Sequence, residues 1–380
     1  MQTKNQIYDV AVAGGGLAGL ASSILLARAG HKVVLLEKNH YPFHRVCGEY
    51  ISEESRPFLV SLGLAFGELK LPEIRRLVVT APDGSKLETA LDPGGFGISR
   101  FLLDATLASL ARSAGVVLME GTRVTDIYSE DGLMKIRLPL QVITSKVAVG
   151  SYGKRSNLDL KWNRDFVRQK PCKLNNLLGV KYHIRTDLPA DTISLHNFKD
   201  GYCGVSRIEN DLYCLCYLTN ANNLGLSNNS IRLMEERILG RNPVLDQLLR
   251  SAERTWPEPV SISQVSFAAK SQVEDHVLMV GDAAGMITPL CGNGMSMALH
   301  GSKLLAEQVT AFLSGRIPRQ EMENNYQRNW RLQFGSRLRA GRMIQRFFGD
   351  PLLTKLLITA GRNSPSLTQW LIRQTRGEQF

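Results

Sequence analysis

Apolar residues at the start of the chain follow a strand, helix, strand pattern. Residues 10–13 form a short apolar run, a helical pattern continues to Gly30, and residues 33–36 form a second apolar run that ends at Glu37. Short apolar runs on either side of an apolar helix are typical of buried parallel strands joined by a helical crossover. The pattern therefore predicts a βαβ unit.

The rest of the chain continues as mixed α and β structure. We expect a hairpin over 74–91 that turns at Asp83–Gly84, because two alternating runs flank a turn dipeptide there. Repeated alternation over 178–218 predicts an antiparallel sheet. The other expected helices are 53–62, 100–115, 230–239 and 295–313, and the other expected strands are 116–119, 124–128, 141–150, 260–267 and 276–280.

The glycines between the first strand and the first helix indicate a dinucleotide site. Gly14 permits a tight turn, Gly16 lets a pyrophosphate approach the backbone, and Gly19 lets the helix pack closely. The helix N-terminus offers unpaired N–H groups and partial positive charge to phosphates. Glu37 suits a ribose hydroxyl. A membrane span is the alternative, since 10–27 carries no charge, but the glycine triplet and the terminal acid argue against it.

A second signature lies near residue 280 and favours a flavin over a nicotinamide. An apolar strand leads into Gly281–Asp282, and a glycine-rich loop then opens a new helix. An aspartate at a strand end can hold a polyol such as the ribityl chain, and a glycine-flanked helix N-terminus suits a reduced, anionic flavin ring. A generic strand–turn–helix remains the alternative. The loop residues of interest are Pro289, Gly292, Asn293 and Gly294.

Charge and cysteine content narrow the remaining possibilities. The six cysteines have no zinc or disulfide spacing, so we expect no metal. The net charge of +11 is concentrated after residue 316, where arginines alternate with apolar residues. Basic amphipathic helices suit an anionic membrane surface, and ordinary solvated faces are the alternative. No nucleic-acid motif accompanies the charge, and no signal peptide is expected, so we expect a cytoplasmic protein with peripheral membrane contact left open.

These motifs resemble the flavoprotein family that groups geranylgeranyl reductases with group A aromatic hydroxylases of the p-hydroxybenzoate hydroxylase type. The resemblance implies FAD, with Arg45 near its diphosphate and ribityl, Arg100 at the start of a helix over the cofactor, and Val124 over the adenine. The positions assigned to the first motif are Gly14, Gly16, Leu17, Ala18, Gly19, Glu37 and Lys38. Gly281, Asp282, Pro289, Gly292, Asn293 and Gly294 match the family's second motif and flavin loop.

Two departures from the family pattern bear on chemistry. Tyr152 stands where hydroxylases have an aspartate tied to NAD(P)H use, so the electron donor, NAD(P)H or another reductant, stays open. Cys47–Gly48 is similar to the Cys-Gly of geranylgeranyl reductases. The tryptophan motif of flavin halogenases is missing, so halogenation is not expected.

Two side chains are candidate catalytic residues. Cys47 could donate a proton or tune the flavin, or it could be a small buried packing residue. Tyr202 could hydrogen-bond a substrate oxygen, or it could be an ordinary core tyrosine.

The sequence as a whole predicts an α/β fold: a Rossmann-like FAD-binding domain of the glutathione reductase type, an antiparallel substrate domain and a basic helical tail. The expected segments are 1–70, 98–160 and 265–315 for the FAD domain, 71–97 and 161–264 for the substrate domain, and 316–380 for the tail.

We expect an FAD-dependent oxidoreductase that hydroxylates a hydrophobic phenolic or lipid-like substrate through a flavin C4a-hydroperoxide. Reduction of isoprenoid double bonds is the alternative, and a non-catalytic lipid-binding protein on the same fold is a third hypothesis.

Overall fold

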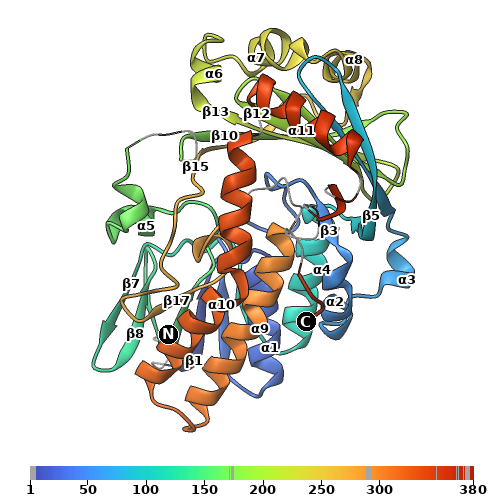
Figure 1. The fold of residues 1–380 in the computed structure, drawn as a ribbon. Coiled ribbons are helices and arrows are strands. Elements are labelled where there is room, and N and C mark those ends of the chain that lie inside the picture. Colours follow the sequence, from blue (N-terminus) through green and yellow to red (C-terminus); the bar gives the residue numbers. More distant parts are fainter. Residues whose placement is uncertain are drawn as a thin grey trace.

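Two sheets and the helices packed on them make up the protein (Figure 1), seen in a computed structural model. The structure describes residues 6–170, 172, 175–287, 293–347, 349–364, 366, 368–370, 372 and 377–380. Within these residues one sheet has eight strands and the other nine. The predicted α/β class is confirmed.

The first sheet is built on the predicted βαβ unit. Its parallel strands are adjacent in the order β17, β9, β1, β2, β6. Along the chain, β2 is added on one side of β1 and β9 is added later on the other side. A topological switch point therefore lies between β1 and β9, and ligands of such sheets bind at this point. The bounds are β1 (Ile7–Ala13), β2 (Val33–Leu36), β6 (Val117–Met119), β9 (Val142–Gly150) and β17 (Val277–Met279), with β16 (Val273–Glu274) antiparallel at one edge.

Helices pack on the first sheet and bury its hydrophobic core. α1 packs against α4 and α9, and α9 in turn packs against α10. α1 ends before Gly30, whose φ of +88° is the left-handed conformation that ends helices at glycine. The bounds are α1 (Leu17–Arg28), α4 (Arg100–Ser113), α9 (Gly294–Leu313) and α10 (Arg319–Phe347).

A small antiparallel ribbon extends the first sheet. β7 (Asp126–Glu130) and β8 (Leu133–Arg137) form a hairpin that pairs with β9. The sequence predicted a strand over 124–128, and the observed strand begins two residues later, which leaves Val124 in the loop before it. β8 was not predicted.

The second sheet carries the predicted hairpin and antiparallel strands. Its path is β14, β10, β13, β12, β11, β4, β5, β3, with β15 beside β10. β4 pairs with β11 in parallel, so the sheet is not antiparallel throughout. The two strands are far apart in sequence and are joined by a crossover rather than a hairpin, which permits the parallel pairing. The bounds are β3 (Tyr50–Ser52), β4 (Glu73–Thr80), β5 (Lys86–Gly97), β10 (Leu177–Arg185), β11 (Thr192–Phe198), β12 (Gly201–Arg207), β13 (Tyr213–Asn220), β14 (Glu253–Arg254) and β15 (Val260–Val265).

Short helices cover one face of the second sheet. Side chains of β10 and β13 on this face, among them Tyr182 and Tyr217, form a core with α7 and α8. α8 was not predicted, although Asn242 caps it by accepting hydrogen bonds from the N–H groups of Val244 and Leu245. The bounds are α6 (Ala221–Gly225), α7 (Ile231–Arg237) and α8 (Pro243–Ser251), with α2 (Arg56–Ser61), α3 (Phe66–Leu69) and α5 (Asn157–Lys161) elsewhere in the chain.

The basic C-terminal segment packs on both sheets. α10 buries Tyr326, Trp330 and Phe334 in the core of the first sheet. α11 (Pro351–Asn363) lies against the second sheet and buries Ile358 there (Figure 1). The helical C-terminal region is therefore part of the packed structure.

Candidate cofactor site at the carboxyl edge of the first sheet

The turn between β1 and α1 has the shape that the glycine motif predicts. Gly14 has φ +110°, and a Cβ there would lie 2.6 Å from the carbonyl oxygen of Ser151. A Cβ on Gly19 would lie 2.1 Å from the carbonyl oxygen of Gly14. At Gly16, by contrast, the nearest atom to a Cβ is 3.8 Å away, on the Arg100 guanidinium. Gly14 and Gly19 are thus required by close packing, whereas Gly16 leaves the backbone open to a ligand.

The N-terminus of α1 has the properties of an anion site. Gly16 is its N-cap, no side chain caps it, and no acidic residue lies in its first turn. Leu17 and Ala18 begin the helix, so their N–H groups belong to the end that carries partial positive charge. The chemistry of this donor set fits the diphosphate of a dinucleotide.

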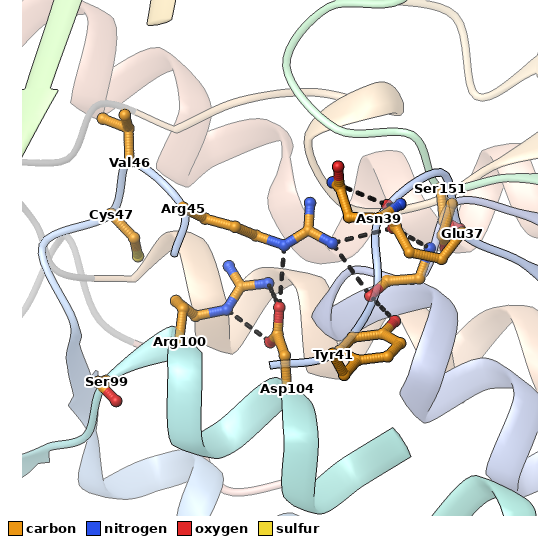
Figure 2. A network of polar contacts seen from close by, with 12 residues as sticks. Glu37, Asn39, Tyr41, Arg45, Val46, Cys47, Ser99, Arg100, Asp104 and Ser151 are labelled. Carbon is orange, nitrogen blue, oxygen red and sulfur yellow. Dashed lines mark hydrogen bonds and ion pairs between the residues drawn. The ribbon is translucent and has the colours of Figure 1, made fainter. Parts of the chain in front are cut away.

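Glu37 directly follows β2 and is only 3% exposed. Figure 2 shows its polar contacts. One carboxylate oxygen accepts hydrogen bonds from the Gly15 N–H (2.9 Å) and from Arg45 (3.0 Å), and the other accepts from the Asn39 N–H (3.0 Å). The Tyr41 hydroxyl donates to the Gly15 carbonyl oxygen. Glu37 therefore ties the glycine turn to the loop after β2, and Lys38 beside it is exposed.

Two predicted arginines share one buried carboxylate, Asp104, which the sequence reading missed (Figure 2). Arg45 Nε donates to Asp104 Oδ2 at 3.0 Å, and Arg100 donates to both oxygens at 2.7 and 2.8 Å. Burial opposes the charge of Arg100, but the neighbouring Asp104 carboxylate raises the pKa of that guanidinium overall. The i, i+4 spacing of Arg100 and Asp104 on one helix was the signal that could have found this pair.

The second motif lies against the first. Gly281 follows β17 with φ +63°, and a Cβ there would lie 3.0 Å from the Ala18 side chain of α1. Asp282 is the next residue, and its carbonyl oxygen accepts a hydrogen bond from Lys270 Nζ at 2.8 Å. Burial lowers the pKa of Lys270 to about 8. The two glycine motifs, almost 270 residues apart, thus meet at one edge of the sheet.

Tyr152, the departure from the family pattern, belongs to a buried polar network beside Asp282. Its hydroxyl donates to Asp159 Oδ1 at 3.0 Å, and burial raises its pKa. Arg164, 2% exposed, donates to Asp159 at 2.8 Å and to the Ala283 carbonyl oxygen at 3.1 Å. The sequence reading missed Asp159 and Arg164, which hold the Gly281–Asp282 turn in place.

The other residues predicted to bind the cofactor lie around this edge of the sheet where the structure describes them. Val124 is partly buried against the core, in a segment whose Thr122 N–H donates to the Glu37 carbonyl oxygen. Asn293 is the N-cap of α9 and Gly294 its first residue. Pro289 and Gly292 lie outside the described residues.

The two candidate catalytic residues lie in different places. Cys47 Sγ is 3.7 Å from Met295 Sδ in the first turn of α9, and its carbonyl oxygen accepts from Cys214 Sγ at 3.2 Å. Tyr202 is 3% exposed on β12 and belongs to a core cluster with Ile358 of α11. Its partner on β13 is Leu218, four residues from Cys214, so the structure does not bring Tyr202 to Cys47.

Comparison with known proteins agrees with this geometry. The FAD binding domain family matches residues 9–44, which contain the glycine turn, Glu37 and the loop after it. Over these residues the chain is similar to the FAD-binding domain of flavoenzymes, and FAD-dependent oxidoreductase is the enzyme class that the comparisons support.

Two curated relatives cover most of the chain. "Conditioned medium factor receptor 1" of Dictyostelium discoideum is 26% identical over 87% of this chain and 68% of its own length. "Digeranylgeranylglycerophospholipid reductase 2" of Methanothermobacter thermautotrophicus is 27% identical over 92% of this chain and 91% of its own length.

Two solved structures show the same fold. The flavin-dependent brominase Bmp2 has TM-score 0.79 at 19% identity and covers 97% of this chain and 93% of its own. A geranylgeranyl bacteriochlorophyll reductase-like protein from Thermoplasma acidophilum has TM-score 0.77 at 18% identity and covers 99% and 97%.

Proposed function

We propose that the protein reduces carbon–carbon double bonds of an isoprenoid lipid, with FAD as the hydride carrier. The observation that carries this proposal is the position of the Cys47–Gly48 segment. Cys47 packs on the first turn of α9, beside Asn293 and Gly294, and is held from the second sheet by Cys214. Its thiol therefore lies where the loop assigned to the flavin ring ends and α9 begins.

The named relatives support the same reaction. Digeranylgeranylglycerophospholipid reductases match most of this chain at low identity, over 90% of both lengths in one case. This reverses the order of preference that the sequence alone suggested, in which hydroxylation came first.

The chain's own residues supply binding, orientation and exclusion of water. The α1 N-terminus with Arg45 and Arg100 would bind the diphosphate, and Asp282 the ribityl chain. Bound FAD supplies hydride transfer. Cys214 contacts Cys47 and lies two residues before Cys216 on β13, so both face the same side of the sheet. This face, which also carries Gly204, the partner of Cys216 in β12, would form the wall opposite the flavin.

Hydroxylation, the reaction that the sequence motifs first suggested, is the second candidate, and the chain shares its fold with a flavin-dependent brominase. One experiment separates the two. The protein is first reduced photochemically. One sample is then mixed with a digeranylgeranyl phospholipid in the absence of oxygen, and a second sample is mixed with an alkylphenol in the presence of oxygen. The proposal predicts a lipid that gains two hydrogens per double bond under anaerobic conditions. A phenol that gains one oxygen atom, with the lipid unchanged, would overturn it.

We further propose that the substrate is met at an anionic membrane surface. Leu332 of α10 is 76% exposed and lies in one hollow with Arg328, Arg331 and Arg339. A basic surface with exposed apolar residues suits acidic lipid headgroups. No helix among the described residues is long and apolar enough to cross a bilayer.

Vesicle sedimentation tests the membrane proposal. We expect binding to vesicles with acidic lipid and loss of that binding in Arg328→Glu. Arg232→Glu, at an 85% exposed side chain paired with Glu236, is the matched control and should bind normally. Equal binding by both variants would contradict the proposal.

A further inference from the structure

A buried charged cluster lies between the two sheets, outside the contacts assigned to the cofactor. We call Glu49, Lys181 and His183 the Glu49 cluster. Lys181 Nζ donates to one oxygen of Glu49, and His183 Nε2 lies 2.6 Å from the other. Glu49 and Lys181 are fully buried and His183 is 3% exposed. Removing such charges from water is unfavourable, so a cluster in this place indicates a role beyond packing.

The backbone of Glu49 is held in a left-handed conformation. Its φ of +55° is uncommon for a residue other than glycine. The Ile98 N–H donates to its carbonyl oxygen at 3.0 Å, and the Arg100 N–H donates to its carboxylate at 2.7 Å. The carboxylate is thus fixed by the start of α4 on one side and by β10 on the other.

Lys181 and His183 are two residues apart on β10, so they face the same side of the strand. For Glu49, burial opposes ionisation, but Lys181 and then His183 lower its pKa overall to about 2. Burial likewise opposes the charge on Lys181, and Glu49 raises its pKa overall. Glu49 and Lys181 therefore stay an ion pair at neutral pH and hold the imidazole of His183 in one orientation.

An aromatic group connects His183 to the surface. Its ring centroid is 5.1 Å from that of His44 and 4.8 Å from that of Trp256. His44 stacks on Phe101 at 4.7 Å, and Phe101 is 37% exposed. Among the described residues, His44 Nδ1 and Trp256 Nε1 are buried atoms with no hydrogen-bond partner. Unpaired polar atoms of this kind mark a place for water or a ligand.

The cluster also approaches Cys47. Cys214 Sγ lies within 4.8 Å of the ligand atoms of Glu49 and His183, and the same sulfur donates to the Cys47 carbonyl oxygen. Cys47 in turn contacts Met295, so the cluster reaches the start of α9 through Cys214 and Cys47. It therefore bridges the surface near Phe101 and the edge assigned to the cofactor.

We infer that His183 is the proton-transfer residue of this redox site, positioned by Glu49 and Lys181 and supplied by water on the side where His44 and Trp256 have unpaired polar atoms. The inference rests on the proposed function. Reduction of a double bond adds a hydride to one carbon and a proton to the other, with both electrons coming from the reduced flavin. The proton would leave the imidazolium of His183, and a proton from water would restore it. Hydrogen bonding through Nε2 leaves Nδ1 to make this exchange.

A metal ion is the competing occupant of this cluster. Glu49, His183 and Cys214 are ligand types that zinc accepts. The Lys181 ammonium, however, already bonds to Glu49, and a cation placed there would be repelled by it. The arrangement thus favours proton transfer.

The first test uses His183→Gln, with Glu209→Gln as the control. Glu209 also accepts hydrogen bonds at the start of α4, from the N–H and hydroxyl of Ser99, but it lies outside the cluster. We expect His183→Gln to lower single-turnover reduction about 100-fold at unchanged flavin content, and added imidazole to restore activity to His183→Ala. Glu209→Gln should keep wild-type turnover. Full activity of His183→Gln, or no imidazole rescue, would overturn the inference.

A second measurement needs no turnover and no cofactor. In flavin-free wild-type protein, we expect a slowly exchanging low-field proton NMR signal from the His183–Glu49 hydrogen bond, absent in His183→Gln and Glu49→Gln and present in Glu209→Gln. A stoichiometric metal in the purified protein, or a signal that persists in both cluster variants, would overturn the inference. If the wild type reduces no lipid at all, the proposed function fails, while this signal still reports on the cluster.

Discussion

Asp104→Asn is the change whose outcome the structure specifies most closely. The carboxylate is 1% exposed and accepts three hydrogen bonds, one from Arg45 and two from Arg100. Asparagine keeps the shape but removes the charge, and its amide nitrogen would face guanidinium donors. Breaking a buried ion pair costs roughly 3–5 kcal/mol because an uncompensated charge remains. We therefore expect the flavin-free protein to lose about 3 kcal/mol of unfolding free energy.

FAD should offset part of that loss. With Asp104 neutralised, Arg100 loses its carboxylate partner and Arg45 keeps only Glu37, so more positive charge remains beside the place where the diphosphate would bind, and the variant should bind FAD at least as tightly as the wild type. Urea unfolding with and without FAD measures both quantities. Glu88→Gln, an exposed acid paired with Arg76 and Lys86, is the control and should leave the unfolding free energy nearly unchanged, because solvent screens exposed ion pairs.

Two results would refute this reasoning. If Asp104→Asn costs no more than the control, the buried network is not the stabilising unit that its geometry indicates. If instead flavin-free stability is unchanged and FAD affinity falls, Asp104 acts through direct contact with the cofactor.

Three further predictions follow from single contacts. Gly19→Ala should abolish FAD binding or folding, because its Cβ would lie 2.1 Å from the Gly14 carbonyl oxygen. Gly16→Ala should fold, because its Cβ would have no neighbouring atom closer than 3.8 Å. Flavin content and thermal unfolding distinguish the two variants. Asp282→Ala should lower flavin occupancy with little change in flavin-free stability, and unchanged occupancy would count against the ribityl contact. The pKa of Glu49 is lowered from 4.5 to about 2, so its contribution to stability is present above pH 4.5 and lost as the pH falls toward 2. Acid unfolding of Glu49→Gln should lack that slope, and an unchanged slope would argue against the ion pair.

The cofactor edge could be predicted because its signals are local in sequence. Gly14, Gly19 and Gly281 adopt conformations or close approaches that a side chain would obstruct, so glycine itself carries the information. The strand–helix pattern around these glycines predicts parallel strands, so the carboxyl ends of β1 and β17 lie at the same edge of the sheet. The same reasoning placed the β4–β5 hairpin, where Gly84 has φ +84°.

The buried polar groups could not be predicted in the same way. Glu49 and Lys181 are 132 residues apart, and the sequence around each residue has no pattern that predicts its partner. Arg164 and Ala283 are likewise joined across 119 residues. Such pairs arise only when both sheets are assembled, and hydrophobic periodicity contains no information about them. The parallel pairing of β4 with β11 was missed for the same reason.

The central claim is best tested by the absorbance of the purified protein as it is reduced and reoxidised. We predict a yellow protein with one FAD per chain, reduced by light without oxygen, whose oxidised flavin spectrum returns when a digeranylgeranyl phospholipid is added anaerobically. A colourless protein that takes up no FAD, or a reduced flavin that only oxygen reoxidises, would contradict the account.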